Sequence, residues 1–269
     1  MRVVCVGLAT RDSIWRVPAF PEPDGRVVAT ELVVAGGGPA ATAAVTLARL
    51  GVEVGFAGAV GDDAAGRFVR AGLEEEGVDL TLLATIAGGR TPESAILVSP
   101  DGARSIVHHQ GSARIEELEV QAEWLHVDHA GYGRVRGATS IDGGNPIPGL
   151  SLDGIALYAP TEERLRADFG DAEAARAAGA ETVVVTRGAN GSVATTRDGV
   201  IETSGVACDP VSTLGAGDVF HGALVAFLVR GAPLRDALVA ANGAAALSCR
   251  ALDGRSAIPT LDELERSLR

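Results

Sequence analysis

Short apolar runs alternate along this chain with helix-forming segments, and this alternation constrains the fold more than any other feature. Val3–Val6 and Val52–Ala59 have the length and composition of buried strands. Ala40–Leu50 and Ala64–Gly77, which follow these runs in turn, have helical periodicity. Because strands that alternate with helices pair in parallel and carry the helices on their faces, we predict an α/β fold with a doubly wound, mostly parallel sheet.

Two stretches rich in hairpin signals, at about residues 11–34 and 88–109, do not fit such a sheet. The first has three prolines and a strand-like run at Val27–Val34; in the second, Ser94–Val98 and Ser105–His109 flank a Pro-Asp-Gly turn. We expect both to project as a small β lid on a single domain spanning residues 1–269. The glycine-rich dozen residues after Asp128 make a full helical crossover improbable, so we expect the core to be trimmed there.

The basic residues of the chain are all arginine: it has 23 of them and no lysine. This excludes phosphate loops and protein-kinase sites that depend on a lysine, and Schiff-base chemistry. The net charge of −12 argues against a nucleic-acid partner. No apolar run has the length of a membrane span, residues 1–30 lack the order of a secretory signal, and the three cysteines lack metal or redox spacing. We therefore expect a cytoplasmic protein with no membrane partner.

The segment Thr213–Leu224 carries the strongest functional signal. Gly215 and Gly217 leave bare backbone amides just before an apolar helix at Val219–Val229. The N-terminus of such a helix offers unpaired N–H groups and a positive dipole end, which suits phosphate. Asp218 can take the proton from an attacking hydroxyl, and its place at the helix start predicts a low pKa. The alternative is a capped turn with an Asp favoured only by the dipole.

Taken with two further motifs, this segment resembles the ribokinase-like (PfkB) family of carbohydrate kinases. The motifs are Gly37-Gly38-Pro39-Ala40-Ala41-Thr42, continued by Val60-Gly61-Asp62-Asp63, and a loop at Thr186–Gly191 that resembles the family's nucleotide side. Within the family, the amino-acid sequence around these glycines, around His221 and at Gly254-Arg255 is most similar to that of kinases of 6-deoxy-6-sulfofructose. The resemblance implies a ribokinase-like fold that transfers the γ-phosphoryl group of ATP, with Mg²⁺, to a sugar hydroxyl.

The resemblance also implies roles for individual residues. Asp218 would be the catalytic base, and the amides around Gly215, Ala216 and Gly217 would form the anion hole. The substrate-side candidates are Asp12, Gly37, Gly38, Thr42, Arg26 and His108, and the nucleotide-side candidates are Thr186, Gly188, Gly191 and Asn242. A solvated loop role for Asp12 and a packing role for Asn242 are the alternatives.

The chain departs from the family pattern at the cation sites. Where the family has Asn-x-x-Glu to hold Mg²⁺ through water, this chain has Thr161-Glu162-Glu163-Arg164, so Glu162 or Glu163 is the candidate metal contact. Ser212-Thr213-Leu214 replaces a motif that contains Asp, which puts a monovalent-cation site in doubt.

Histidines near the strand ends leave further alternatives open. His221 lies one turn after Asp218 and is compatible with substrate contact or with packing. His126, Asp128 and His129 crowd one strand end, but no further ligand at a helpful spacing supports a metal site there.

These features predict an ATP-dependent sugar kinase for a fructose-like ketose or a ketose derivative such as sulfofructose. At the positions that would bind the sulfonate, the chain has Arg26, His108 and about Ala130, so one cation is kept and a plain or phosphorylated ketose is an equal candidate. A nucleoside kinase of the same fold and a non-catalytic sugar or nucleotide sensor are the alternatives. By resemblance only, we expect a homodimer formed through the lids.

Overall fold

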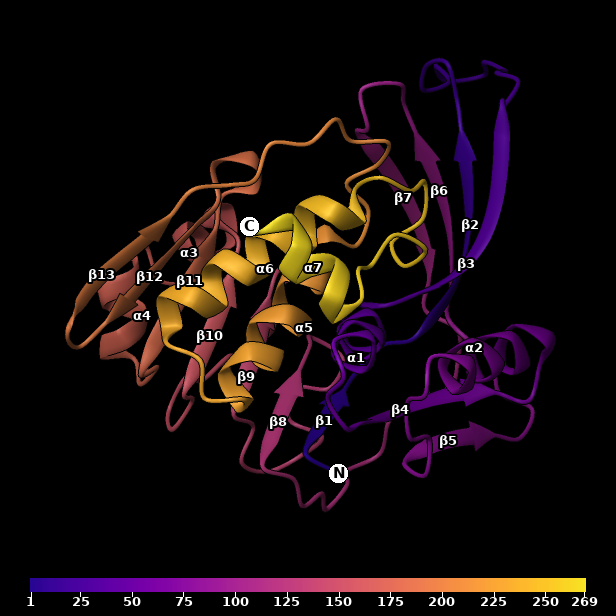
Figure 1. The fold of residues 1–269 in the computed structure, drawn as a ribbon. Helices are drawn as coiled ribbons and strands as arrows, with labels where there is room; N and C mark the ends of the chain where they lie inside the picture. Colours follow the sequence, from indigo (N-terminus) through magenta and orange to yellow (C-terminus); the bar gives the residue numbers. More distant parts are fainter.

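Nine strands form one sheet at the centre of the computed structural model, which describes all of residues 1–269 (Figure 1). All neighbouring strands run parallel except for an antiparallel hairpin added at one edge. The prediction of a mostly parallel α/β sheet is confirmed. In spatial order the strands are β13 (Gly199–Thr203), β12 (Ser192–Thr196), β11 (Thr182–Thr186), β10 (Leu157–Pro160), β9 (Ser140–Gly143), β8 (Trp124–Val127), β1 (Val3–Val6), β4 (Val54–Gly61) and β5 (Leu83–Ile86).

Helices cover both faces of this sheet, because successive side chains of each buried strand point to opposite sides. In β1, Val3 and Cys5 join one apolar cluster, whereas Val4 and Val6 join another. The helices of the first cluster lie in front of the sheet in Figure 1, and those of the second lie behind it. The first set is α1 (Pro39–Arg49), α2 (Ala64–Glu75), α5 (Ala216–Val229), α6 (Leu234–Ser248) and α7 (Leu261–Ser267), and the second is α3 (Glu162–Asp168) and α4 (Ala172–Ala177).

The second face is covered partly by irregular chain. No helix joins β8 to β9, as the short glycine-rich segment after Asp128 predicted, and none joins β9 to β10. Side chains from these connections, among them Tyr132, Ile147 and Leu152, pack on the sheet instead. The trimmed crossovers therefore keep a buried core without their helices.

A separate four-stranded sheet forms the lid, which projects from the large sheet at the upper right of Figure 1. Its order is β3 (Glu31–Gly37), β2 (Thr10–Arg16), β6 (Glu93–Val98) and β7 (Arg104–His109), with β2 and β6 parallel. The two predicted stretches do build it. The strand predicted at Val27–Val34 is wrong in its bounds, because pairing with β2 sets Gly37 opposite Thr10 and leaves residues 17–30 as a loop.

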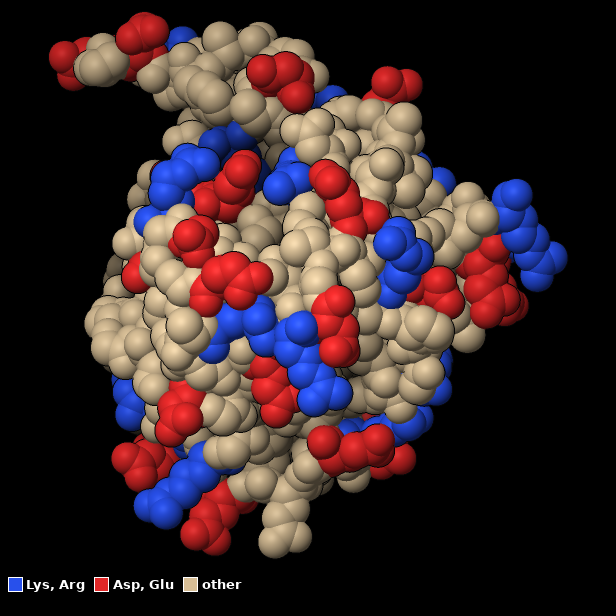
Figure 2. All heavy atoms as spheres, turned by 90° about the vertical axis from the view of Figure 1, so that its left-hand side faces the viewer, with Lys and Arg blue, Asp and Glu red and all other residues tan.

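Charged side chains of both signs are interspersed on the face that carries the β13 edge, and no basic patch gathers there (Figure 2). None of the helices has the length and apolar character needed to cross a membrane.

Candidate active site

The turn before α5 is built as an anion site. Gly215 is the residue before the helix and has a φ of 74°, in the left-handed region that favours glycine. The backbone N–H groups of Gly217 and Asp218 donate to no acceptor within the chain, whereas Ala216 N–H donates to Thr213 O at 3.4 Å. A Cβ on Gly217 would meet nothing within 4 Å, so the turn faces open space. Of the amides predicted around Gly215, Ala216 and Gly217, that of Ala216 is therefore paired, and the neighbouring amide of Asp218 is bare as well.

Asp218, in the first turn of α5, has its pKa raised to about 7. Burial is the main cause, the nearby Asp142 carboxylate adds to it, and His221 opposes both. The low pKa predicted from the helix dipole is therefore wrong, because desolvation and a second carboxylate outweigh the dipole. A carboxylate with a pKa near neutrality is a stronger base than the sequence suggested.

The inner surface of the lid presents a polar row across three strands. Asp12 on β2 pairs in register with Ser94 on β6, which pairs with His108 on β7. Ser94 Oγ lies 3.3 Å from His108 Nδ1. Asp12 is 6% exposed, its Oδ1 has no hydrogen-bond partner, and burial raises its pKa. The predicted substrate residues Asp12 and His108 are thus brought together, and Asp12 Oδ1 is free to accept a hydrogen bond from a substrate hydroxyl.

The glycines of the second motif leave room for this row. A Cβ on Gly37 would stand 1.9 Å from Asp12 Oδ2, and one on Gly38 would stand 2.3 Å from the carbonyl oxygen of Leu8. Gly38 also has a φ of 93°. Both positions therefore require glycine for space, and Gly38 for conformation as well.

Arg255 is a site residue that the sequence did not reveal. Its Nη2 donates to Gly37 O at 2.7 Å, and its Nε donates to Thr42 Oγ1 at 3.2 Å. Burial lowers its pKa to about 10, against the opposing effects of the Asp12 and Asp218 carboxylates. The guanidinium therefore lies close enough to both acids to interact with their charges. The only sequence signal was the similarity to the family at Gly254-Arg255, from which no role for Arg255 was predicted.

The lid also contacts the turn before α5 directly. Arg104 on β7 donates from Nη1 to Thr213 Oγ1 at 2.9 Å, and Thr213 donates to Gly102 O at 3.4 Å. The tip of the β6–β7 hairpin is thereby tied to the segment that precedes the bare amides.

A pocket of about 300 Å³ adjoins the polar row. His108 belongs to both, and the other polar or charged lining side chains are Gln110, Arg114, His129, Tyr132 and Arg134. No Asp or Glu lines the pocket, although the chain has an excess of acidic residues. Ala130 lines it as well, but Arg26 lies exposed in the loop of residues 17–30 and is not among the lining residues.

The nucleotide-side candidates lie around the edge hairpin. Thr186 ends β11, and a short 3₁₀ turn at Gly188–Asn190 leads to Gly191, where a Cβ would stand 2.1 Å from Thr203 O. Asn242 on α6 is buried, and its Nδ2 donates to Ser192 Oγ, Thr203 Oγ1 and Ser204 O. These bonds fit the packing alternative for Asn242, which fastens α6 to β12 and β13.

The candidate metal contacts Glu162 and Glu163 are exposed in the first turn of α3. Thr161 caps this helix by accepting a hydrogen bond from Arg164 N–H at 3.2 Å. Glu162 lies 3.9 Å from Arg166, a loose exposed pair that leaves its carboxylate accessible.

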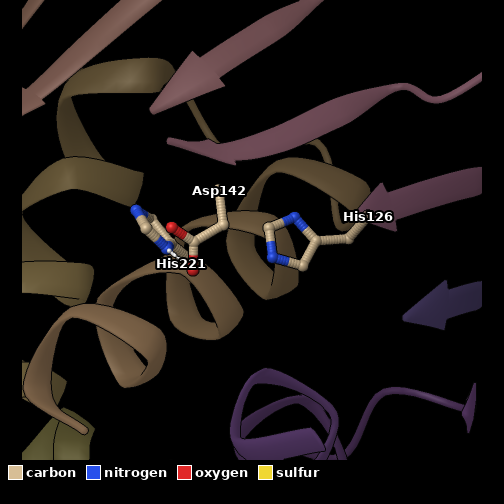
Figure 3. Close-up of side chains that lie close together, drawn as sticks. All are labelled: His126, Asp142 and His221. Atoms are coloured by element: carbon tan, nitrogen blue, oxygen red, sulfur yellow. Dashed lines mark ion pairs between the residues drawn. The ribbon is translucent and has the colours of Figure 1, made fainter. Parts of the chain in front are cut away.

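The histidine-rich strand end is divided differently from what the sequence suggested. Asp128 accepts hydrogen bonds from the backbone amides of Leu8, Ala40, Ala130 and Gly131, and so ties β1, α1 and the loop after β8 together. His126 points the other way, toward Asp142 on β9 and His221 on α5 (Figure 3). His221 thus meets a carboxylate beneath the α5 turn.

A family model described as the pfkB family carbohydrate kinase matches residues 1–148 and 156–261. The chain belongs to this family. It is therefore a carbohydrate kinase, as the resemblance of its motifs to this family implied.

Individual relatives agree over nearly the full chain. The chain is 30% identical to an ATP-dependent ribose-1-phosphate kinase of Halopiger xanaduensis, over 97% of this chain and 96% of the relative. It is 26% identical to a ribokinase of Haemophilus influenzae, over 96% and 95%. The structure of Arabidopsis thaliana ribokinase, complexed with ribose and ATP, matches with a TM-score of 0.83 at 23% identity, over 100% and 98%, which shows the shared fold.

Proposed function

We propose that this kinase transfers the γ-phosphoryl group of ATP to a hydroxyl of a furanose sugar, and that the sugar is a ketose or ketose derivative with an anionic tail. The observation that carries the proposal is the placement of Arg255. Its guanidinium contacts the glycine motif and lies near both Asp12 and Asp218. One acid can hold the sugar while the other takes the proton of its attacking hydroxyl.

Phosphoryl transfer at this site needs positioning and charge stabilisation more than covalent chemistry. The amides of Gly217 and Asp218 would stabilise charge on the transferring group. Asp218, with its pKa near 7, would accept the hydroxyl proton as the new O–P bond forms. The lid residue Asp12 would orient the sugar through its free oxygen.

ATP is proposed to lie along the loop Thr186–Gly191, at the carboxyl end of β11. Mg²⁺ would neutralise phosphate charge, and the exposed Glu162 or Glu163 is suited to hold it through water, because Mg²⁺ keeps most of its hydration and needs few carboxylates. Thr213, in the segment where the family's monovalent-cation motif is altered, is bonded by the Arg104 guanidinium, which supports a reaction independent of such a cation.

The anionic tail follows from the pocket beside His108. Two arginines and two histidines line it without any acid, in a chain with a net charge of −12. This lining has no carboxylate that would repel an anion, and its arginine and histidine side chains offer several N–H donors to a bound anion. The Halopiger relative is named for ribose 1-phosphate, a phosphorylated aldose, which supports the anionic group but not the ketose.

We also propose a homodimer through the outer face of the lid. Register places Trp15 between Leu32 and Leu97, and Ala95 between Ser13 and Val107. Leu32 is 56% and Val107 73% exposed. An apolar sheet face of this kind is suited to a second copy of the lid.

The proposed setting is the cytoplasm. All three cysteines are unpaired, and Cys5 and Cys249 are buried, which is consistent with a reducing compartment.

The test is ADP release with ATP and Mg²⁺ across neutral ketoses and aldoses, their phosphate and sulfonate derivatives, and nucleosides. An anionic ketose derivative should exceed its neutral parent by about tenfold in kcat/KM, the effect of one charge-assisted contact. Arg134→Gln should remove this preference, whereas Arg136→Gln, which is exposed outside the pocket lining, should keep it. Equal kcat/KM for the anionic derivative and its neutral parent would overturn the proposed anionic tail alone. Turnover of nucleosides only, or of no compound in the panel, would overturn the proposal of a sugar kinase.

A further inference from the structure

A buried cluster of two imidazoles and one carboxylate lies between the sheet and α5. His126 comes from β8, Asp142 from β9 and His221 from α5, and they are 2%, 3% and 5% exposed. One ligand atom of each lies within 4.8 Å of the others. Figure 3 shows the imidazole of His126 pointing at the Asp142 carboxylate, with His221 against that carboxylate from the other side.

The imidazole nitrogens that face into this cluster have no well-aligned hydrogen bond. They are His126 Nε2 and the two ring nitrogens of His221, all of them buried. His221 Nδ1 lies 3.0 Å from Asp142 Oδ2, so these two groups form an ion pair when the imidazole is protonated. Buried polar groups in folded proteins are nearly always bonded, so the unpartnered Nε2 atoms of both histidines beside this carboxylate require an explanation.

The outer contacts of the cluster are, in contrast, complete. His126 Nδ1 is hydrogen-bonded to Ser140 Oγ at 2.9 Å, and Ser140 Oγ accepts from Trp124 Nε1–H at 2.7 Å. Asp142 Oδ1 accepts from Gly144 N–H at 2.8 Å. These bonds fix His126 and Asp142 from behind and leave Nε2 and Oδ2 facing inward. Support of this kind is what orients the ligands of metal ions in proteins.

We propose that His126, Asp142 and His221 bind a divalent transition-metal ion of the Zn²⁺ class. Two imidazoles and one carboxylate are the donors that such ions prefer over Mg²⁺. Donors about 2.1 Å from a tetrahedral ion lie about 3.4 Å apart, so ligand atoms that now lie within 4.8 Å of one another would approach by at most about 1.4 Å on binding. Asp142 and His221 also act on the pKa of Asp218, so the cluster adjoins the proposed catalytic base, but the proposal does not depend on which substrate the enzyme uses.

The proposed ion would join three elements beneath the anion site. It would cross-link β8 and β9 to α5, one helical turn after Asp218. Because binding favours the folded chain, metal should raise the melting temperature.

The experiment is a Co²⁺ titration of the full-length protein after chelator treatment, with long incubation because the ligand atoms are buried. The wild type should bind about one Co²⁺ per chain, show the visible absorption bands of His and Asp coordination, and melt at a higher temperature. His126→Gln and His221→Gln should each weaken binding by at least about tenfold. His109→Ala, an exposed histidine on the lid, should bind as the wild type does.

Binding that survives in both folded variants would overturn the proposal. Circular dichroism shows whether each variant folds. If either does not, the wild-type titration still decides, because a chain that fails to hold about one ion against a weak chelator contradicts the site. None of these measurements depends on kinase activity, so the proposed function and the metal site can fail separately.

Discussion

Asp218 illustrates how one carboxylate can be tuned by groups from distant segments. The helix start favours its ionised form, whereas burial and Asp142 favour the protonated form and prevail. The resulting pKa of about 7 would let Asp218, as the proposed base, both accept a proton and be regenerated at neutral pH.

The pH–rate profile should report this value. Only ionised Asp218 can take the hydroxyl proton, so kcat/KM should rise with pH and level off above an apparent pKa near 7, with a fall of about tenfold per unit below it. The measurement uses metal-stripped enzyme assayed with Mg²⁺ alone. A profile that is already flat between pH 5 and 8 would show that desolvation does not control Asp218.

Arg255→Lys should separate the effect of the two hydrogen bonds donated by the guanidinium from the effect of its charge. Lysine keeps the cation but cannot donate to both Gly37 O and Thr42 Oγ1 in the present arrangement. We expect kcat/KM for the sugar to fall about 10- to 100-fold, the effect of losing one charge-assisted hydrogen bond. Arg250→Lys, an exposed arginine bonded only to Leu247 O, is the control. Equal kinetics for the two variants would remove Arg255 from the site.

At the scale of elements, Asp63 joins α2 to the segment that enters the lid. Its carboxylate caps α2 by accepting from Gly66 N–H at 2.7 Å, and it accepts from Thr91 N–H at 3.0 Å and Thr91 Oγ1–H at 2.6 Å. These bonds lower its pKa. The Asp-Asp motif that marked the family is thus, at its second residue, a structural joint.

Asp63→Ala should lower the free energy of unfolding by about 2 kcal/mol at neutral pH. Because the folded pKa is depressed, the charged form stabilises the fold above the unfolded pKa of about 3.9, and this contribution is lost as pH falls below it. Urea unfolding at pH 7 and pH 3 measures the difference, with Asp62→Ala as the control whose side chain accepts no hydrogen bond. A difference between variants that is unchanged at pH 3 contradicts the account.

Elements whose signals are local in sequence were predictable. The α5 turn, the lid strands of the 88–109 stretch and the absent crossover after Asp128 all follow from neighbouring residues. Arg255 and the Asp142–His221 contact were not predictable, because they join segments far apart in the chain and no spacing announces them. The pKa of Asp218 was predicted wrongly for the same reason.

At the scale of the molecule, the lid contributes residues both to the candidate site and to the proposed assembly. Its inner face carries Asp12, Ser94 and His108, and its outer face carries Leu32 and Val107. A partner lid on the outer face would hold the inner row over the α5 turn.

The dimer can be tested by light scattering after size exclusion. The wild type should have twice the mass of one chain, and Val107→Glu should shift it toward the monomer, because a charge would be buried between the apolar faces. Val200→Glu, an exposed valine on β13, should leave the mass unchanged. A wild-type monomer at micromolar concentration would contradict the interface.

The most direct measurement compares phosphorylated sugar formed by the wild type and by Asp218→Asn, detected by mass spectrometry with the best substrate of the panel. Asp218→Asn should lower kcat by about 10²- to 10⁴-fold while ATP binding is retained. Asp209→Asn, an exposed aspartate, should keep full turnover. Phosphorylated sugar formed by Asp218→Asn at the wild-type rate would contradict the assignment of the base and of the site built around it.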